Sequence, residues 1–240
     1  MGSTPSPGSA GGRSRGRLHE YFLQHTGGDI HRWHGYFEIY ERHLSRFVGE
    51  PVAMLEIGID RGGSLRMWRD FLGPQARLFA IDVNEECRSL APEDVPVFIG
   101  DQADREFLRA CLSRMPTLDI VLDDGGHMCR QQITSFEELY PALSDDGVYI
   151  VEDTHTNYWK RFIDTDDGST FVQLAKDLTD RLTEWHLDRA TNKAFRVPPG
   201  ERTAHVNVSE FCRTTHSIHF YNSVIVFERR RMEEPFRERR

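Results

Sequence analysis

Short apolar runs alternate with segments of helical periodicity along most of this chain, and that alternation limits the fold more than any other feature. Apolar runs of strand length occupy residues 53–59, 77–83, 95–100, 118–124 and 147–153. Helical periodicity fills the gaps between them at 64–72, 104–114 and 130–143. Strands and helices that alternate in this way form a parallel sheet with helices packed on its faces. We therefore predict an α/β fold.

A hairpin is predicted close to the C-terminus. The stretch SIHFYNSVIVFER, residues 217–229, contains two apolar strands around a tight turn at Asn222 and Ser223. The last strand then runs antiparallel to its neighbour. A parallel sheet of five strands closed by such a hairpin resembles the Rossmann-like fold of the class I S-adenosylmethionine-dependent methyltransferases. The resemblance implies a seven-stranded, mostly parallel sheet with helices on both faces and a helical N-terminal extension.

Length and composition are consistent with a single folded domain. A chain of 240 residues with 38% hydrophobic residues can bury one sizeable core. We expect this domain at 18–228, after a disordered leader at 1–17 that is rich in glycine, serine and proline and before a charged tail at 229–240. No apolar window approaches the ~20 residues of a membrane span, and none has the length of a signal peptide. We therefore expect a cytoplasmic protein with no membrane partner.

The charge balance argues against nucleic acid as a partner. The whole chain carries a net charge of −8. Without residues 1–17, which hold three arginines, and 228–240, which hold six arginines and four glutamates, 21 basic side chains remain against 34 acidic ones, or −13. A body this acidic is poorly suited to bind a phosphate backbone. The four cysteines lack a CxxC pair, which argues against a zinc site and a disulfide framework.

Two segments fall outside the predicted sheet. Residues 18–48 read as one or two amphipathic helices, whose stripe we expect to pack against the core rather than to bind a cofactor. The stripe consists of Trp33, Tyr36, Phe37, Tyr40, Leu44 and Phe47. Residues 155–215 form an insertion with one helix, whose apolar face carries Phe171, Leu174, Leu178, Leu182 and Trp185. The rest of the insertion is rich in turns, and we expect it to form a lid over the site.

A glycine-rich turn, EIGIDRGGS, follows the first strand at its carboxyl end, where open sheets of this kind bind ligands. Its glycines permit a tight turn and a close backbone approach, and Ser64 can cap the next helix. The glycines do not match GxGxxG, and no P-loop ending follows, so neither a nicotinamide dehydrogenase nor a P-loop nucleotide site is favoured. We assign to a cofactor site Glu56, Gly58, Gly62 and Ser64.

Polar residues at the next two strand ends favour an adenosine-containing cofactor. Asp82 ends the second strand, twenty residues after Gly62, where an acidic side chain can accept both hydroxyls of a ribose. Asp101 and Gln102 follow the third strand and are placed to read an adenine edge. The combination of a glycine-rich turn and a spaced acid is stronger than either feature alone.

Two neighbouring strands end in paired carboxylates followed by a histidine. These residues are Asp123, Asp124 and His127 in VLDDGGH, and Glu152, Asp153 and His155 in VEDTH. Adjacent residues within a strand point to opposite faces, so both members of a pair reach one cavity only where the chain turns at the end of the strand. The simpler explanation, that the acids cap following helices, is less favoured because both strands end in the same way.

The motifs taken together are LEIGI, GGSLRMW, AIDV, GDQAD, DIVLDDGGH, SFEELYPAL, GVYIVEDTHTNYW and SIHFYNSVIVFE, in this order within residues 29–228. This set resembles the metal-dependent sugar O-methyltransferases of antibiotic biosynthesis, which act on macrolide, aminocoumarin and similar glycosylated products. HRWHGYFEIYERH is similar to the helix that precedes the core in relatives that act on rhamnose-type sugars. An enediyne rhamnosyl methyltransferase is one such relative.

This resemblance implies S-adenosylmethionine-dependent methylation of a sugar hydroxyl, such as one on a rhamnose, in a glycosylated small-molecule acceptor, with S-adenosylhomocysteine as product. It assigns Asp124, Glu152 and Asp153 to Mg²⁺, with Mn²⁺ or Ca²⁺ as substitutes, and His127 to the general base. Carboxylate oxygens are ligands that these ions prefer. A positioned base removes the proton that a weakly acidic sugar hydroxyl does not readily lose. Asp123 is expected to face the other way, toward the cofactor or a backbone amide.

Several alternatives stay open. His155 lies two residues after Asp153 and is a rival base, while His31 and His34 either touch cofactor or substrate or serve packing. A metal-assisted O-methyltransferase of a phenol or catechol is the second candidate function. A non-catalytic binding scaffold is the third, although it predicts gaps in the site that are not apparent. The aromatic N-terminal helices serve a homo-oligomer interface as readily as a core.

Overall fold

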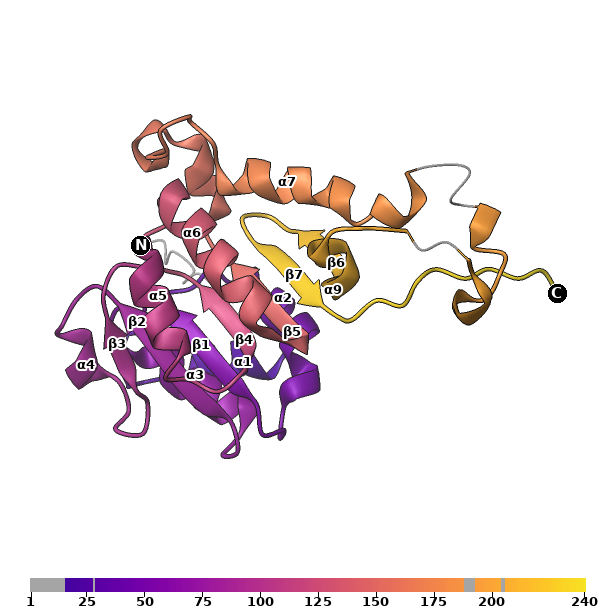
Figure 1. Ribbon diagram of the computed structural model, residues 1–240. Coiled ribbons are helices and arrows are strands. Elements are labelled where there is room, and N and C mark those ends of the chain that lie inside the picture. The colour runs from indigo at the N-terminus through magenta and orange to yellow at the C-terminus, as the bar shows by residue number, and fades with distance from the viewer. Residues whose placement is uncertain (1–15, 28, 188–192, 204–205) are drawn as a thin grey trace, which may run out of the picture.

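The computed structural model describes residues 16–27, 29–187, 193–203 and 206–240. Its central element is a seven-stranded sheet with the strand order β3-β2-β1-β4-β5-β7-β6 (Figure 1). The strands are β1 (Ala53–Ile57), β2 (Arg77–Asp82), β3 (Val97–Ile99), β4 (Leu118–Asp123), β5 (Leu143–Val151), β6 (Thr215–Phe220) and β7 (Ile225–Arg229). The first five pair in parallel, whereas β7 runs antiparallel to both β5 and β6. This topology confirms the predicted fold class and the C-terminal hairpin.

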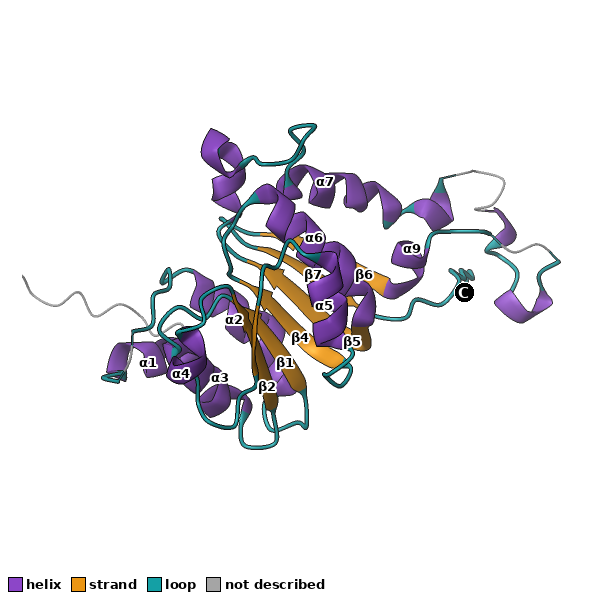
Figure 2. Cartoon of the chain, turned by 60° about the vertical axis from the view of Figure 1, so that its left-hand side comes forward, coloured by secondary structure: helices purple, strands orange, loops and turns teal. Residues whose placement is uncertain are grey.

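Helices cover both faces of the sheet (Figure 2). They are α1 (Arg17–Gln24), α2 (Tyr36–Leu44), α3 (Gly63–Leu72), α4 (Cys87–Leu90), α5 (Arg105–Leu112), α6 (Cys129–Leu139), α7 (Phe171–Arg181) and α9 (Glu210–Thr214). The apolar residues of α1, α2 and α3 pack with one face, which includes Met54 and Ile120. Those of α5, α6 and α7 pack with the opposite face, which includes Leu55 and Val121. Neighbouring strand residues belong to different clusters because successive side chains point to opposite faces.

The strands end earlier than their apolar runs predict. β1 ends before Gly58, β4 before Asp124 and β5 before Glu152, so these three functional candidates lie in the turns rather than in the sheet. β2 likewise ends before Val83. The third strand shrinks from 95–100 to Val97–Ile99, because Pro96 has no N–H to donate to a neighbouring strand. The fifth strand begins at Leu143 instead of 147.

The N-terminal stripe largely packs into the core, as predicted. Tyr36, Phe37, Tyr40 and Leu44 of α2 are buried against the sheet and α3. The prediction is wrong for Trp33, whose side chain is 62% exposed because the helix begins only at Tyr36. One large aromatic ring is therefore left open beside the carboxyl ends of the strands.

The insertion after β5 consists of short helical turns followed by α7, which packs on α6. The predicted apolar face of its helix is too long, because α7 ends at Arg181 and Trp185 instead packs with Phe195 and Cys212 in a separate small cluster. This part extends beyond the sheet in Figure 1. Residues 188–192 and 204–205 of the predicted lid, and 1–15 of the predicted leader, lie outside the described residues. The lid, the leader and the single domain at 18–228 remain predictions.

Within the part of the chain that the structure describes, none of the helices has the length and apolar character needed to cross a membrane.

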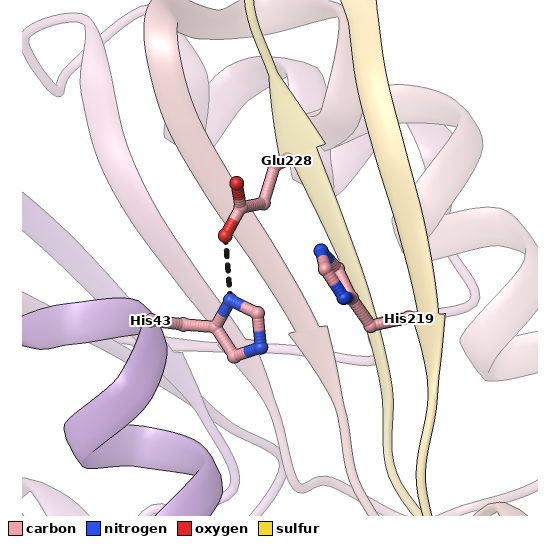
Figure 3. A group of neighbouring side chains, drawn as sticks. All are labelled: His43, His219 and Glu228. Carbon is pink, nitrogen blue, oxygen red and sulfur yellow. Dashed lines mark hydrogen bonds and ion pairs between the residues drawn. The ribbon is translucent and has the colours of Figure 1, made fainter.

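A buried hydrogen-bond chain joins α2 to the C-terminal hairpin. His43 is buried, and its Nδ1 lies 2.6 Å from Oε1 of Glu228 while its Nε2 lies 2.8 Å from the hydroxyl oxygen of Tyr221. Figure 3 shows His219 beside His43 and Glu228. These three side chains are close enough together to hold a metal ion. Both ring nitrogens of His43 already have protein partners, and Arg46 also pairs with Glu228 at 3.4 Å. The group is therefore satisfied as a structural connection between helix and sheet.

Replacement of Glu228 should destabilise the protein more at neutral pH than in acid, relative to the unaltered chain. The hydrogen bond from His43 lowers the pKa of Glu228 to about 2. A carboxyl with a lowered folded pKa contributes stability above its unfolded pKa of about 4.3, and this contribution is lost as the pH falls toward 2. We expect Glu228→Gln to reduce the free energy of unfolding by about 1–3 kcal/mol at pH 7. Urea titrations at pH 7 and pH 3.5 should show a smaller difference at the lower pH, and an equal difference would contradict this assignment.

Candidate active site

A cavity of about 530 Å³ opens at the carboxyl ends of the parallel strands. It contains most of the residues that the sequence singles out, namely Gly58, Ser64, Asp82, Asp101, Gln102, Asp124, His127, Glu152 and Asp153. Three predicted cofactor residues, Glu56, Gly62 and Asp123, do not line it. Glu56 accepts a hydrogen bond from Arg32, Asp123 accepts one from Gln102, and Gly62 lies against the backbone of Leu90. The turns after β1, β2, β3, β4 and β5 thus converge on one site, as the parallel sheet requires.

The glycine-rich turn lies against the loop that follows β4. Gly58 has a φ of 82°, and a Cβ at this position would lie only 2.2 Å from the carbonyl oxygen of Asp124. Gly62 has a φ of 73°, and a Cβ there would lie 2.6 Å from the carbonyl oxygen of Leu90. Both positions need glycine for conformation and for space. The turn therefore packs closely against the loop after β4 and against the end of α4.

Asp82 and Asp101 are held by backbone amides. The two carboxylate oxygens of Asp82 accept hydrogen bonds from the amides of Ile59 at 3.0 Å and Asn84 at 2.9 Å. Asp101 accepts from the amide of Ala103 at 2.8 Å and is exposed at the rim. Asp82 is thus held by the glycine-rich turn and by its own loop, Asp101 is held by its own loop, and both line the cavity.

Gln102 and Asp123 form a buried brace behind the cavity. Nε2 of Gln102 donates to Oδ1 of Asp123 at 2.9 Å and to Oγ of Ser135 at 3.0 Å, and its Oε1 accepts from the amide of Gly126 at 3.1 Å. Burial raises the pKa of Asp123 to about 6. Of the two orientations expected for Asp123, this geometry agrees with the one toward a backbone amide, since Gly125 N lies 3.5 Å from its Oδ1. The adenine contact of Gln102 stays a prediction.

Asp124, His127 and Asp153 form the part of the acid-rich region with metal-ligand spacing. One ligand atom from each lies within 4.8 Å of the other two. Nε2 of His127 is 3.8 Å from Oδ1 of Asp124 and 3.7 Å from Oδ2 of Asp153. Two carboxylates from neighbouring strand ends and one imidazole therefore face the same small space.

Glu152 lines the same cavity but does not belong to this group of three. It is buried, accepts a hydrogen bond from the hydroxyl of Tyr40, and has Oε2 at 3.8 Å from Nε of Arg32. Burial raises the pKa of Glu152 to about 7. The sequence prediction groups Glu152 with Asp124 and Asp153 as a metal ligand, and this role of Glu152 stays a prediction.

Arg32 is a site residue that the sequence analysis missed. Its guanidinium lies 2.8 Å from Oε1 of Glu56 and 2.5 Å from Oδ2 of Asp124, in addition to its contact with Glu152. Arg32 lies in the loop before α2, where only the histidines and aromatic residues of HRWHGYF attract notice. Its partners come from three strand ends, so local sequence contains no signal for them.

The region keeps an excess of negative charge that fits a divalent cation. Glu56, Asp124, Glu152 and Asp153 supply four carboxylates, whereas Arg32 supplies one positive charge among them. Burial, first of all, and the neighbouring carboxylates raise the pKa of Asp124 well above its usual range. Buried carboxylates in such numbers must bind a cation or take up protons. The partly buried carboxylates of Asp124 and Asp153 offer oxygens for that cation, and oxygen ligands suit Mg²⁺.

His127 and Asp153 adopt left-handed backbone conformations, with φ of 57° and 50°. Such conformations are uncommon for residues other than glycine and occur often at functional sites. Burial lowers the pKa of His127, which favours the neutral imidazole. Among the described residues its buried Nδ1 has no hydrogen-bond partner, and its Nε2 faces the two carboxylates.

The other histidines differ in how they relate to the site. Nδ1 of His155 lies 2.5 Å from Oγ of Ser223 and 3.8 Å from Oδ1 of Asp153, so it is close to the carboxylates but engaged elsewhere. His34 pairs with His19 at 2.9 Å, in agreement with a packing role. His31 is exposed and lines the cavity.

Searches with family models find no match to the chain. Two curated methyltransferases of Streptomyces olivaceus are similar to it. The 8-demethyl-8-(2-methoxy-alpha-L-rhamnosyl)-tetracenomycin-C 3'-O-methyltransferase is 31% identical over 215 residues, which are 84% of this chain and 51% of that protein. The 8-demethyl-8-alpha-L-rhamnosyl tetracenomycin-C 2'-O-methyltransferase is 32% identical over 231 residues, which are 92% of this chain and 57% of that protein.

A third relative comes from the mycinamicin pathway. The mycinamicin VI 2''-O-methyltransferase of Micromonospora griseorubida is 31% identical over 212 residues, which are 84% of this chain and 49% of that protein. This chain thus spans about half the length of the curated relatives that it matches.

A solved structure shows the same arrangement of elements. The MycE methyltransferase from the mycinamycin biosynthetic pathway, in complex with Mg, SAH and mycinamycin VI, superposes with a TM-score of 0.71 and 26% identity over 94% of this chain and 55% of that chain. The sequence relatives and this structure confirm the resemblance drawn from the motifs. The chain belongs to the macrolide and tetracenomycin sugar O-methyltransferase family, within the class I S-adenosylmethionine-dependent methyltransferases.

Proposed function

We propose that this chain methylates a hydroxyl of a deoxysugar, such as a rhamnose, on a glycosylated natural product, with S-adenosylmethionine as donor and Mg²⁺ as the bound metal. The observation that carries the proposal is the convergence of Asp124, His127 and Asp153 in the cavity that also holds the glycine-rich turn and Asp82. A methyl donor and a hydroxyl acceptor can therefore meet beside a base. Three relatives named for sugar O-methylation support the acceptor class.

The cofactor side of the cavity is formed by the turns after β1, β2 and β3. Gly58 lines this side of the cavity, Asp82 is oriented for a ribose, and Asp101 lies at the rim near the place expected for adenine. This order of groups matches the order of parts in S-adenosylmethionine, and the MycE complex contains its product, SAH. The methyl group is expected to point toward the turn after β4.

The transfer itself needs a deprotonated acceptor. The sugar oxygen attacks the methyl carbon, the carbon–sulfur bond breaks, and S-adenosylhomocysteine leaves as a neutral thioether. Nε2 of neutral His127 receives the hydroxyl proton, since it faces the space between Asp124 and Asp153. Asp124 and Asp153 would hold a divalent cation, which would supply the Lewis acidity that lowers the pKa of a bound hydroxyl. Arg32 and Glu152 stand behind these ligands and set their charge and orientation.

The remaining parts of the proposal concern the whole chain. The proposal treats residues 18–228 as one methyltransferase domain, because the two hydrophobic core clusters lie on the two faces of the same sheet. The acceptor is a small molecule, and the excess of acidic side chains makes nucleic acid an unsuitable partner.

Removal of His127 should impair the chemical step without loss of binding. We expect His127→Ala to lower kcat about 100-fold or more, because a positioned base typically contributes about 10²- to 10⁴-fold. Calorimetry should show unchanged affinity for S-adenosylhomocysteine and Mg²⁺. The matched control is His155→Ala, which should keep most of the turnover. The reverse result, with the His155 variant inactive and the His127 variant active, would show that His155 is the base.

Metal removal and metal-ligand variants should act in parallel. Treatment with a chelator should abolish methyl transfer, and added Mg²⁺ should restore it. We expect Asp124→Asn and Asp153→Asn to weaken Mg²⁺ binding roughly tenfold or more, with partial recovery of rate at high Mg²⁺, since each removes a charged oxygen ligand. Glu152→Gln, which alters the second layer of carboxylates, should weaken binding less. Full activity of the chelated enzyme would refute the metal.

Asp82 should determine cofactor affinity. We expect Asp82→Ala to weaken S-adenosylhomocysteine binding roughly tenfold, because it removes the acceptor of the ribose hydroxyls, which is worth about 1.5–3 kcal/mol for a charged group. Calorimetry measures this directly, with Asp145→Ala as the control, since Asp145 is exposed in β5 and does not line the cavity. Binding of NAD in place of S-adenosylhomocysteine would exclude the proposed cofactor.

A further inference from the structure

A second cavity, of about 600 Å³, lies next to the proposed catalytic site and takes no part in the steps above. We name it the aromatic groove, after its lining residues Trp33, Tyr36, His155, Trp159 and Tyr221. Trp33 also lines the catalytic cavity, so the two spaces share a wall. The groove is therefore within reach of a molecule bound at Asp153 and His127.

Two indole rings are left open in this groove. Trp33 is 62% exposed and Trp159 is 49% exposed. Both rings meet the ring of His155 edge-on, with centroid distances of 6.4 Å for Trp33 and 4.9 Å for Trp159. Exposed aromatic side chains gathered in a concave site commonly mark a place for a ligand.

The groove is tied to the reacting groups by direct hydrogen bonds. The hydroxyl of Tyr36 donates to Oδ1 of Asp153 at 2.5 Å, so one side chain forms a wall of the groove and orients a proposed metal ligand. His155 is held by Ser223 at the tip of the C-terminal hairpin. On the far side, Tyr221 is held by His43 at 2.8 Å. These walls are supported by α2, η3 (Thr154–Tyr158) and the hairpin, and so they present a preformed surface.

We propose that the aromatic groove binds the aglycone of the acceptor, as a flat aromatic or otherwise apolar ring system, while the sugar that it carries lies at Asp153 and His127. The inference rests on the proposed function and adds the place and chemistry of the aglycone. The volume lies within the range of ~300–1,000 Å³ typical of small-molecule sites. Indole faces bind flat apolar rings by stacking, which adds to the effect of burial. Arg42 and Glu38 also line the groove and add charged groups to its wall.

The test compares two probes that differ only in the aglycone, 1-naphthyl α-L-rhamnopyranoside and methyl α-L-rhamnopyranoside. Binding is measured by calorimetry and tryptophan fluorescence with S-adenosylhomocysteine and Mg²⁺ present, with 1-naphthol as a probe for the aglycone alone. We expect the naphthyl glycoside to bind about tenfold more tightly than the methyl glycoside, as an added aromatic stack predicts. Trp159→Ala should remove this advantage and the binding of 1-naphthol, whereas Trp159→Phe should keep most of both.

Controls separate the groove from the fold and from the proposed reaction. Affinity for S-adenosylhomocysteine should stay unchanged in both Trp159 variants, which shows that the site is intact, and Phe236→Ala serves as a matched change of an exposed ring elsewhere. If no probe is methylated but naphthyl binding still depends on Trp159, the groove stands and the proposed function fails. The groove proposal would be overturned if the unaltered chain bound both glycosides equally well and Trp159→Ala left these affinities unchanged. The proposal would also be overturned if Trp159→Ala changed the protein from dimer to monomer in sedimentation without any change in probe affinity. The rings would then contact a second copy of the chain instead of a ligand.

Discussion

The ion cluster around Arg32 is the interaction on which the arrangement of the site depends. One buried guanidinium contacts Glu56 on β1, Asp124 after β4 and Glu152 after β5, and it enters from the loop before α2. Removing one partner of a buried ion pair typically costs about 3–5 kcal/mol, because the remaining charge is left without compensation. The N-terminal helices are thus held to the sheet by charge as well as by apolar packing. The same cluster places Asp124 at the wall of the cavity.

Strained backbone and excess charge occur at the same positions. His127 and Asp153 are left-handed, and both belong to the group with metal-ligand spacing. Neither feature stabilises a fold by itself, and both are maintained by the surrounding contacts, such as the hydrogen bond from Tyr36 to Asp153. A site built in this way gains stability when a cation binds, since binding relieves the repulsion among its carboxylates. A second cavity adjoins this site and shares Trp33 with it.

Periodicity and strand-end chemistry allowed much of this to be predicted. The five parallel strands and the hairpin at Asn222 and Ser223 are predictable because apolar runs and turn residues are local signals. The sugar O-methyltransferase family follows instead from the resemblance of the motifs. Asp82, Asp124, His127 and Asp153 were placed at one edge by the rule that ligands bind at the carboxyl ends of parallel strands. The prediction that Trp33 packs in the core was wrong, because the start of α2 depends on how the preceding loop enters the site.

Local sequence patterns are thus enough for the order of strands and helices along the chain, for the buried faces, and for the polar groups at the strand ends. The contacts among those groups emerge only in the folded chain, where Asp124 lies between His127 and Arg32, Asp153 lies near His127, and Glu152 contacts Arg32 and Tyr40. The physical reason is that a side chain's direction after a strand ends is set by the turn and by partners far away in sequence. Arg32 lies 24 residues from Glu56, and the hydroxyl of Tyr36 reaches a carboxylate 117 residues away. Charge and hydrogen bonding across such separations leave no periodic trace in the chain.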